Sequence, residues 1–233
     1  MKKELHIASK AVHCGREDRK IPTIDLTTTT RIDSLPTAIE SIEAMNEGSL
    51  PLGNSIYSRL HNDTVAGFEQ AFAELENAEA AVAFASGMSA VSTLILQASH
   101  QGGHIIAMKP IYGATDHVLS NTICHTQVSW CTPDNFTDYI QQNTALIMIE
   151  TPANPTCSLI DIQKVVDGAQ GIPVSVDSTF ASPILQQPLQ WGASYAVHSA
   201  TKFIGGHSDI LGGVIACSER DAKRLRKLRI YTG

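Results

Sequence analysis

The chain has 233 residues and a formal charge of −6, and 43% of its residues are hydrophobic. This is enough apolar material to bury a core of one large domain or one and a half, and it excludes disorder of the chain as a whole. The mildly acidic balance gives no general attraction to nucleic acid or to an anionic membrane. A small-molecule or protein partner is therefore favoured.

The five cysteines are scattered, with no CxxC pair and no Cys/His spacing typical of a zinc site. We therefore expect free thiols in a reducing compartment and no bound metal. The first ten residues carry charge without a following apolar stretch, which argues against a secretory signal. No run of residues approaches membrane-spanning length, so the sequence predicts a soluble, cytoplasmic protein.

Residues 1–61 differ in pattern from the rest of the chain. The threonine run at 27–30, the breaks at Pro22 and Pro36 and the Gly/Pro/Asn cluster at 51–54 favour an extended arm. One short helix is expected within it, near Thr37 to Met45. We therefore predict an N-terminal arm at 1–61 followed by one domain at 62–233. Such an arm usually wraps a neighbour.

Within 62–233, apolar runs alternate regularly with amphipathic stretches. A helix is predicted from Asp63 or Thr64, a strand at Ala81 to Phe84 and a second helix at Met88 to Gln97. Further strands are expected at 104–108, 127–130, 145–149, 173–176, 195–197 and 213–217, with helices at 115–122, 134–142 and 161–169. Short buried strands alternating with helices indicate an α/β domain with a largely parallel sheet.

Polar residues follow the ends of the predicted strands. Ligands of such sheets bind at the carboxyl ends of the strands, so most of these side chains should gather on one rim. They are Ser86-Gly87-Met88, Tyr112-Gly113, Glu150 with Asn154, Asp177, and Ser199 with Thr201-Lys202.

Lys202 comes directly after an apolar strand and shortly before Gly205-Gly206-His207. A lysine that is partly desolvated at a sheet rim loses ammonium character and becomes a nucleophile that can form a Schiff base. A lone lysine in this position is more often a solvated surface charge. The other polar groups predicted at the rim favour the functional interpretation.

Asp177 closes a strand, where an ionised carboxylate is costly unless it pairs with a cation such as a protonated pyridine nitrogen. Alternatively, it caps the turn that follows. The Ser86-Gly87-Met88 segment can direct backbone N–H groups at a phosphate, although simple helix entry gives the same pattern. Tyr112 can stack on a pyridine ring, or it is a core aromatic with a wet hydroxyl.

Eight motifs follow one another over nearly the whole chain. They are Ala11-Val12-His13, Tyr57-Ser58-Arg59, Ala85-Ser86-Gly87-Met88, Ile111-Tyr112-Gly113, Glu150 to Pro155, Val176-Asp177 with Thr179-Phe180, Ser199 to Lys202, and Gly205 to Asp209. In this order and approximate spacing the chain resembles the Cys/Met metabolism enzymes that depend on pyridoxal 5'-phosphate (PLP). This transsulfuration group includes cystathionine synthases and lyases and methionine gamma-lyase. The resemblance implies the large domain of a type I PLP-dependent transferase (aspartate aminotransferase-like), with helices on both faces of a mostly parallel sheet.

The resemblance also implies a role for each matching position. Lys202 would bind PLP covalently, Asp177 would pair with the ring nitrogen, and Tyr112 would stack on the ring and move protons. Asn154 would donate to the phenolic oxygen. The phosphate would be held by Ser86, Gly87, Met88, Ser199 and Thr201, joined by Tyr57 and Arg59 of a neighbouring subunit, whose guanidinium suits a phosphate. The working unit would then be a dimer or a homotetramer.

Some positions depart from the family pattern. Ser178 replaces the usual asparagine after the ring-binding aspartate, and Asn62-Asp63-Thr64 replaces Asn-Pro-Thr. Ala114 stands where methionine gamma-lyases carry a cysteine, so that member is less favoured. The family continues into a second domain that supplies an arginine for the substrate carboxylate. The chain ends at Gly233, so we expect that domain to be absent, with the basic stretch Lys223 to Arg229 leading toward it.

The resemblance predicts an enzyme of sulfur amino-acid metabolism. Its substrate would be a sulfur amino acid or an activated homoserine, transformed by elimination or replacement. The alternative is a PLP-binding remnant or interaction protein with little or no catalysis. The sequence leaves open the particular substrate, the choice between elimination and replacement, and whether the chemistry is at the β- or the γ-carbon.

Overall fold

The computed structural model describes residues 6–14, 23–53, 55–100, 102–121 and 126–232. Its elements in chain order are α1 (Ile7–His13), α2 (Leu35–Asn46), α3 (Asp63–Glu76), β1 (Ala80–Phe84), α4 (Gly87–Ser99), β2 (His104–Met108), α5 (Gly113–Ser120), β3 (Gln127–Cys131), η1 (Phe136–Tyr139), β4 (Thr144–Glu150), α6 (Ile162–Gly168), β5 (Val174–Asp177), α7 (Ser182–Leu185), η2 (Pro188–Trp191), β6 (Tyr195–Ser199), η3 (Ala200–Ile204), β7 (Gly213–Cys217) and α8 (Glu219–Thr232).

The strands form one sheet in the order β1-β7-β6-β5-β4-β2-β3. The strands from β6 to β3 in this order pair in parallel, whereas β7 is antiparallel to both β1 and β6. The predicted largely parallel sheet is therefore confirmed. Because β7 runs in the opposite direction, its first residue, Gly213, pairs with Phe84 and Ser199, the last residues of its two neighbours.

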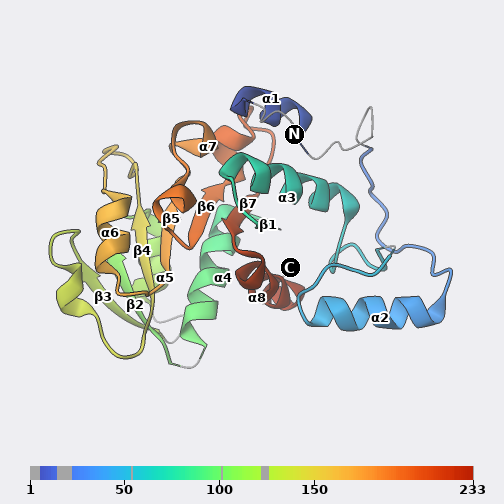
Figure 1. Cartoon of the computed structure of the whole chain (residues 1–233), viewed down its shortest axis with the longest axis horizontal. Coiled ribbons are helices and arrows are strands. Elements are labelled where there is room, and N and C mark those ends of the chain that lie inside the picture. Colours follow the sequence, from blue (N-terminus) through green and yellow to red (C-terminus); the bar gives the residue numbers. More distant parts are fainter. Residues whose placement is uncertain (1–5, 15–22, 54, 101, 122–125, 233) are drawn as a thin grey trace, which may run out of the picture.

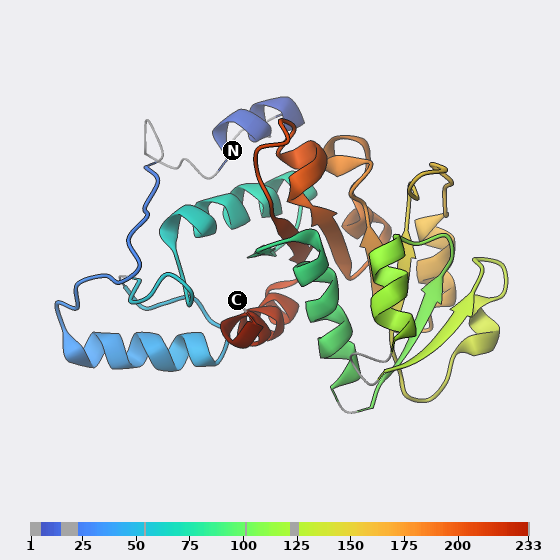
Figure 2. The same ribbon diagram turned by 180° about the vertical axis from the view of Figure 1, so that it is seen from behind.

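Helices cover both faces of the sheet, as predicted (Figures 1 and 2). On one face α4, α5 and α8 contribute Leu94, Leu119 and Leu225 to a single apolar core. On the other face, Phe72 of α3 and Val165 of α6 pack against the strands in two smaller clusters. The sheet is thus buried on both sides, which explains why its strands are nearly continuous apolar runs.

Capping side chains account for the starts of two helices. Asn62 Oδ1 accepts the N–H groups of Thr64 and Val65, at 2.9 and 3.2 Å, where α3 begins. Ser86 Oγ accepts the N–H of Ser89 at 3.1 Å where α4 begins. These bonds satisfy donors that the first turn of a helix leaves without partners.

Region 1–61 contains a helix that the sequence analysis missed. The expected helix near Thr37 to Met45 is α2, which lies beside α8 and to one side of the sheet (Figure 1). However, Ile7–His13 forms α1, which packs against α3, so the prediction of a single helix in the arm is wrong. Residues 1–5, 15–22 and 54 of this region, among them Pro22, lie outside the described residues. The boundary between arm and domain stays a prediction.

The helix predicted at Asp134 to Gln142 is also wrong, since only η1 forms there, as a 3-10 turn. Asn135 Oδ1 accepts the N–H and the hydroxyl of Thr132, at 2.9 and 3.0 Å. Thr144 Oγ1 accepts the N–H of Gln141 at 2.8 Å. Side-chain bonds to the backbone therefore compete with a helical hydrogen-bond pattern at both ends of the segment.

The basic stretch Lys223 to Arg229 belongs to α8 and is amphipathic, as expected. Leu225 is fully buried, and Arg226 is buried with its guanidinium 2.7 Å from Glu219 Oε1. Among the described helices, none is long and apolar enough to cross a membrane.

Candidate active site

The polar residues predicted to follow the strands meet at one edge of the sheet, called the rim here. β1 and β6 are each antiparallel to β7, so they run in the same direction and end at the same edge as β2, β4 and β5. Hydrogen bonds and close contacts link most of the predicted site residues across this edge. The predicted gathering of polar groups on one rim is present in the fold.

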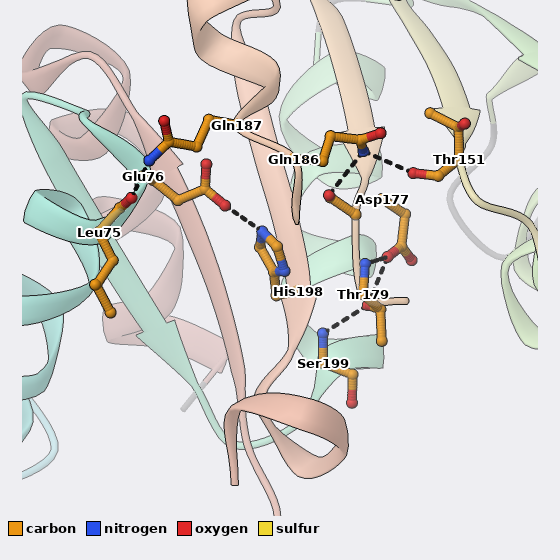
Figure 3. Close-up of polar contacts among 10 residues, drawn as sticks. Leu75, Glu76, Thr151, Asp177, Thr179, Gln186, Gln187, His198 and Ser199 are labelled. Atoms are coloured by element: carbon orange, nitrogen blue, oxygen red, sulfur yellow. Dashed lines mark hydrogen bonds and ion pairs between the residues drawn. The ribbon is translucent and has the colours of Figure 1, made fainter. Parts of the chain in front are cut away.

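A hydrogen-bonded chain crosses the rim from the end of β5 to the end of β6 (Figure 3). Asp177 Oδ1 accepts the hydroxyl of Thr179 at 2.6 Å and its N–H at 3.1 Å. Thr179 Oγ1 in turn accepts the N–H of Ser199 at 2.9 Å. One oxygen of Asp177 thus caps the turn, as the alternative interpretation expected. Within the described residues, Oδ2 makes no hydrogen bond or ion pair.

The state of Asp177 suits a cationic ligand. Burial raises the pKa of the Asp177 carboxyl above its usual range, and the hydrogen bonds from Thr179 offset this effect only in part. A cation opposite Oδ2 would favour the ionised form and relieve the cost of burying it. The residue therefore fits the protonated ring nitrogen of PLP.

Glu150, the last residue of β4, is a second carboxylate at the rim and pairs in register with Asp177. Its Oε1 accepts the N–H of Asn154 at 2.8 Å, and its Oε2 accepts the N–H of Tyr112. Burial is the main reason that the pKa of Glu150 is raised, with a further contribution from Asp177. One buried side chain therefore connects two of the predicted cofactor residues.

The N-terminus of α4, called the cradle here, has the geometry of an anion-binding site. Ser86 accepts the N–H of Ser89 with its hydroxyl and that of Ala90 with its carbonyl. The N–H groups of Gly87 and Met88 have no acceptor within the helix, because they belong to its first turn. A Cβ atom on Gly87 would lie 2.8 Å from Ser199 Cβ, so only glycine permits this approach of α4 to β6. Free N–H groups at a helix N-terminus suit the phosphate of PLP.

Lys202 lies just beyond the end of β6, inside η3. Its backbone angles, φ −90° and ψ −118°, depart from the helical path on either side of it. Its side chain is exposed, so the chain alone does not provide the partial desolvation that we expected from the sequence. The neighbouring Thr201 donates its hydroxyl to the carbonyl of Gly212 at 3.2 Å. To bind a phosphate, the Thr201 hydroxyl would have to donate its proton to a phosphate oxygen instead of to the Gly212 carbonyl.

Tyr57 and Arg59 lie apart from the other candidates. The Arg59 guanidinium is 5.4 Å from the centroid of the Tyr57 ring and donates to the carbonyl of Ile230 near the end of α8. Within the described part of the chain, no hydrogen bond or ion pair joins either residue to the rim. Their role toward a neighbouring subunit stays a prediction.

Sequence analysis gave no role to a set of buried polar contacts near the rim. His198 Nε2 and Glu76 Oε1 lie 2.6 Å apart, and both side chains are fully buried. Gln186 Nε2 donates to the carbonyl of Thr151 at 2.7 Å and to the hydroxyl of Ser178 at 2.8 Å (Figure 3). These contacts brace the ends of β4, β5 and β6. Their partners are distant in sequence, so no local pattern could reveal them.

Other chemistry has less support in the described residues. Cys14, Cys131, Cys157 and Cys217 are free thiols, and Cys124 lies outside these residues. Burial raises the pKa of Cys131 to about 11, which makes its thiolate scarce at neutral pH. Over the residues that the structure describes, no group of three or more His, Cys, Asp or Glu residues could hold a metal ion.

The two-sided sheet and its rim define the large domain of the type I PLP-dependent fold. The family model described as "Cys/Met metabolism PLP-dependent enzyme" matches residues 8–233. The chain belongs to this family.

Named relatives agree with this assignment. The chain is 45% identical over 237 residues to the L-methionine gamma-lyase of Brevibacterium sandarakinum, a match that covers 98% of this chain and 60% of the relative. It is 37% identical over 227 residues to the cystathionine gamma-lyase of Saccharomyces cerevisiae, covering 91% of this chain and 54% of the relative. The chain therefore spans somewhat more than half the length of these relatives.

Solved structures show the same fold. The crystal structure of metB from Corynebacterium glutamicum superimposes with a TM-score of 0.87 at 30% identity, covering 98% of this chain and 60% of that one. Cystathionine gamma-lyase from yeast gives a TM-score of 0.85 at 35% identity, covering 100% of this chain and 60% of that one.

Proposed function

We propose that this protein is a PLP-dependent carbon–sulfur lyase or transferase that acts on sulfur amino acids or activated homoserine. The observation that carries the proposal is the unused bonding capacity at the rim. Asp177 Oδ2 and the N–H groups of Gly87 and Met88 are available for a cationic ring and an anionic phosphate. Lys202 follows at the end of the adjoining strand.

PLP, when bound, supplies an electron sink that stabilises negative charge at the α-carbon of the substrate. The residues of the chain would bind and orient it. Asp177 would keep the ring nitrogen protonated, and Tyr112 would cover the ring face. The Nζ of Lys202 would hold the cofactor and then take the α-proton of the substrate. Further contacts would come from Ser86, Gly87, Met88, Ser199 and Thr201 to the phosphate and from Asn154 to the phenolic oxygen.

Within this class, we infer that γ-elimination is the first reaction to test. Loss of a second proton, from Cβ, allows the sulfur on Cγ to leave as a thiol. With uptake of one water, L-methionine would give methanethiol, 2-oxobutanoate and ammonia. Two of the named relatives, a methionine gamma-lyase and a cystathionine gamma-lyase, support this choice. The relatives named methionine gamma-lyase also outweigh the single position Ala114, which had made that member less favoured.

A second candidate function is PLP binding with little or no turnover. The observation that favours it is the coverage of about 60% of the named relatives. The arginine that the resemblance places on the substrate carboxylate belongs to a second domain in the family. None of the residues assigned a role in this chain binds that carboxylate, and such positioning contributes several kcal/mol to catalysis.

The test begins with PLP binding to the 233-residue chain. We expect a visible absorption band and, after borohydride reduction, a mass adduct on the peptide that contains Lys202. Lys202→Ala should lose both signals and keep its stability within about 0.5 kcal/mol, as expected for an exposed residue. Lys164→Ala is the matched control, because the Lys164 side chain is exposed and its one ion pair within the described residues is with the exposed Asp134.

Persistence of the reducible adduct in Lys202→Ala would contradict the assignment of the lysine. Release of 2-oxobutanoate from methionine or cystathionine would then separate the two candidate functions. Turnover with either substrate supports the lyase, and a stable visible band without turnover supports the binding protein.

A further inference from the structure

We propose that Glu150 is a positioning residue that fixes the backbone of Tyr112 and Asn154 relative to Asp177. The inference rests on the proposed function, because Tyr112 and Asn154 are assigned there to the cofactor. It concerns a side chain to which the sequence motifs assigned no task.

Each carboxylate oxygen of Glu150 accepts a backbone N–H from a different loop at the rim. Oε1 accepts the N–H of Asn154 at 2.8 Å, in the connection from β4 to α6. Oε2 accepts the N–H of Tyr112, in the connection from β2 to α5. Among the described residues, hydrogen bonds between these two connections run only through this carboxylate. A single buried side chain, 5% exposed, therefore sets their separation.

The two residues have few other restraints. Tyr112 is 43% exposed, and as the residue that precedes α5 it makes no capping bond with its side chain. Asn154 is also exposed. Because both side chains are exposed, their starting points depend on the backbone, which the bonds to Glu150 hold together with the local turn bonds at Tyr112 and Ala153.

The pairing of β4 with β5 gives the arrangement a common base. Glu150 lies in register with Asp177, and the preceding residues of the two strands are paired as well. Neighbouring parallel strands hold their spacing closely. The β4–β5 pair therefore fixes the positions of Tyr112, Asn154 and Asp177 relative to one another.

Two substitutions at Glu150 separate the effect of the side chain's charge from the effect of its length. Glu150→Gln keeps the shape but puts an NH₂ group opposite one of the two N–H donors, so one hydrogen bond is lost. Glu150→Asp keeps the charge but is one methylene shorter, so it cannot reach both connections. The matched control is Asp221→Asn, a buried carboxyl that accepts the Ser218 hydroxyl at 2.7 Å where α8 begins, at the edge of the sheet opposite the rim.

The first measurement uses the chain without PLP. Hydrogen exchange followed by NMR should be about tenfold faster or more at the Tyr112 amide, the Asn154 amide or both in Glu150→Gln, because a hydrogen bond to a charged acceptor is lost. In Asp221→Asn both amides should exchange as in the parent chain. The proposed positioning role of Glu150 would be overturned if Glu150→Gln left both amide exchange rates unchanged. An equal change of these rates in Asp221→Asn would also overturn it.

The second measurement is the dissociation constant for PLP. We expect it to rise about tenfold in Glu150→Gln and in Glu150→Asp, again the effect of one lost bond to a charged group. At saturating PLP the reducible adduct should still form on Lys202. Faster amide exchange with unchanged PLP affinity would show that Glu150 holds the two backbone amides, but that this contact does not position the cofactor residues. If the parent chain itself fails to bind PLP, the proposed function fails, and the exchange measurement still decides whether Glu150 holds the two loops.

Discussion

The two edges of the sheet use buried polar side chains in different ways. At the edge where the parallel strands begin, His104 is 1% exposed and has hydroxyl partners for both ring nitrogens, Thr144 and Ser129, each at 2.9 Å. At the rim, Asp177 uses only Oδ1 within the described residues. Burial of a polar group is costly in both places, but only the first group is fully compensated by the chain. Of these two side chains, only Asp177 keeps an oxygen that a ligand can use.

The substitution Asp177→Asn gives the sharpest test of this difference. Because the cation loses its charged partner, PLP affinity should fall by about 10-fold to 100-fold. The cofactor-free chain, however, should become more stable at neutral pH. The pKa of Asp177 is raised by burial, so the folded chain disfavours the ionised carboxylate, and a neutral amide that still accepts from Thr179 removes this cost.

The sign of the pH dependence follows from the same shift. The favourable contribution of Asp177 is complete below its unfolded value of 3.8 and is lost as the pH rises through its raised folded value. The advantage of Asp177→Asn in urea unfolding should therefore grow between pH 4 and neutral pH. A variant that is less stable at pH 7 and binds PLP as the parent does would break the comparison.

A mixing experiment tests whether the rim is completed by another subunit. We propose that Arg59 and Tyr57 serve the phosphate of a neighbour, as the resemblance implies, in a dimer or tetramer. Arg59→Ala and Lys202→Ala chains each lack one part of the site. In randomly mixed dimers about one site in four should be complete, and PLP binding should return to that extent. Absence of any complementation would indicate that the arm serves its own subunit or none.

The smallest effect is expected at the opposite edge, in His104→Gln. Burial lowers the pKa of His104 below 6.5, so its stabilising contribution is present above that pH and is lost as the pH falls below it. At pH 8 the variant should be less stable by about 1 kcal/mol, because glutamine cannot replace both hydrogen bonds.

This difference should narrow between pH 6.5 and pH 5, because glutamine does not titrate. PLP affinity should not change. His117→Gln, at an exposed position on α5, is the matched control in urea unfolding. A parallel pH dependence in parent and His104→Gln would show that this histidine is not a source of acid sensitivity.

The strands and the rim could be predicted because their signals are local. Apolar runs such as 104–108 have the composition of doubly buried strands, and the carboxyl ends of parallel strands meet at one edge whatever their order. The prediction therefore placed Tyr112, Asp177 and Ser199 together without knowing which strand pairs with which.

The supporting contacts could not be predicted, because they depend on strand order and register. Glu150 lies beside Asp177 only because β4 pairs with β5 in a particular register. The bond from Ser199 to Thr179 likewise requires that β6 lie next to β5. Helix α1 is too short to show a clear periodicity, and it packs against α3, which follows far along the chain.

The position of β7 has a consequence for the order in which the molecule is assembled. β1 carries the cradle at its end, and β7, from which it is separated by more than half of the chain, is its partner in the sheet. A nascent chain therefore exposes an unpaired β1 until β7 has been synthesised, and closing so large a loop costs entropy before any contact repays it. Ser86 and Ser199 flank opposite sides of β7, so the cradle and the lysine-bearing turn come together only after that last strand is inserted. Binding of the proposed cofactor is thereby deferred until β7 has been synthesised.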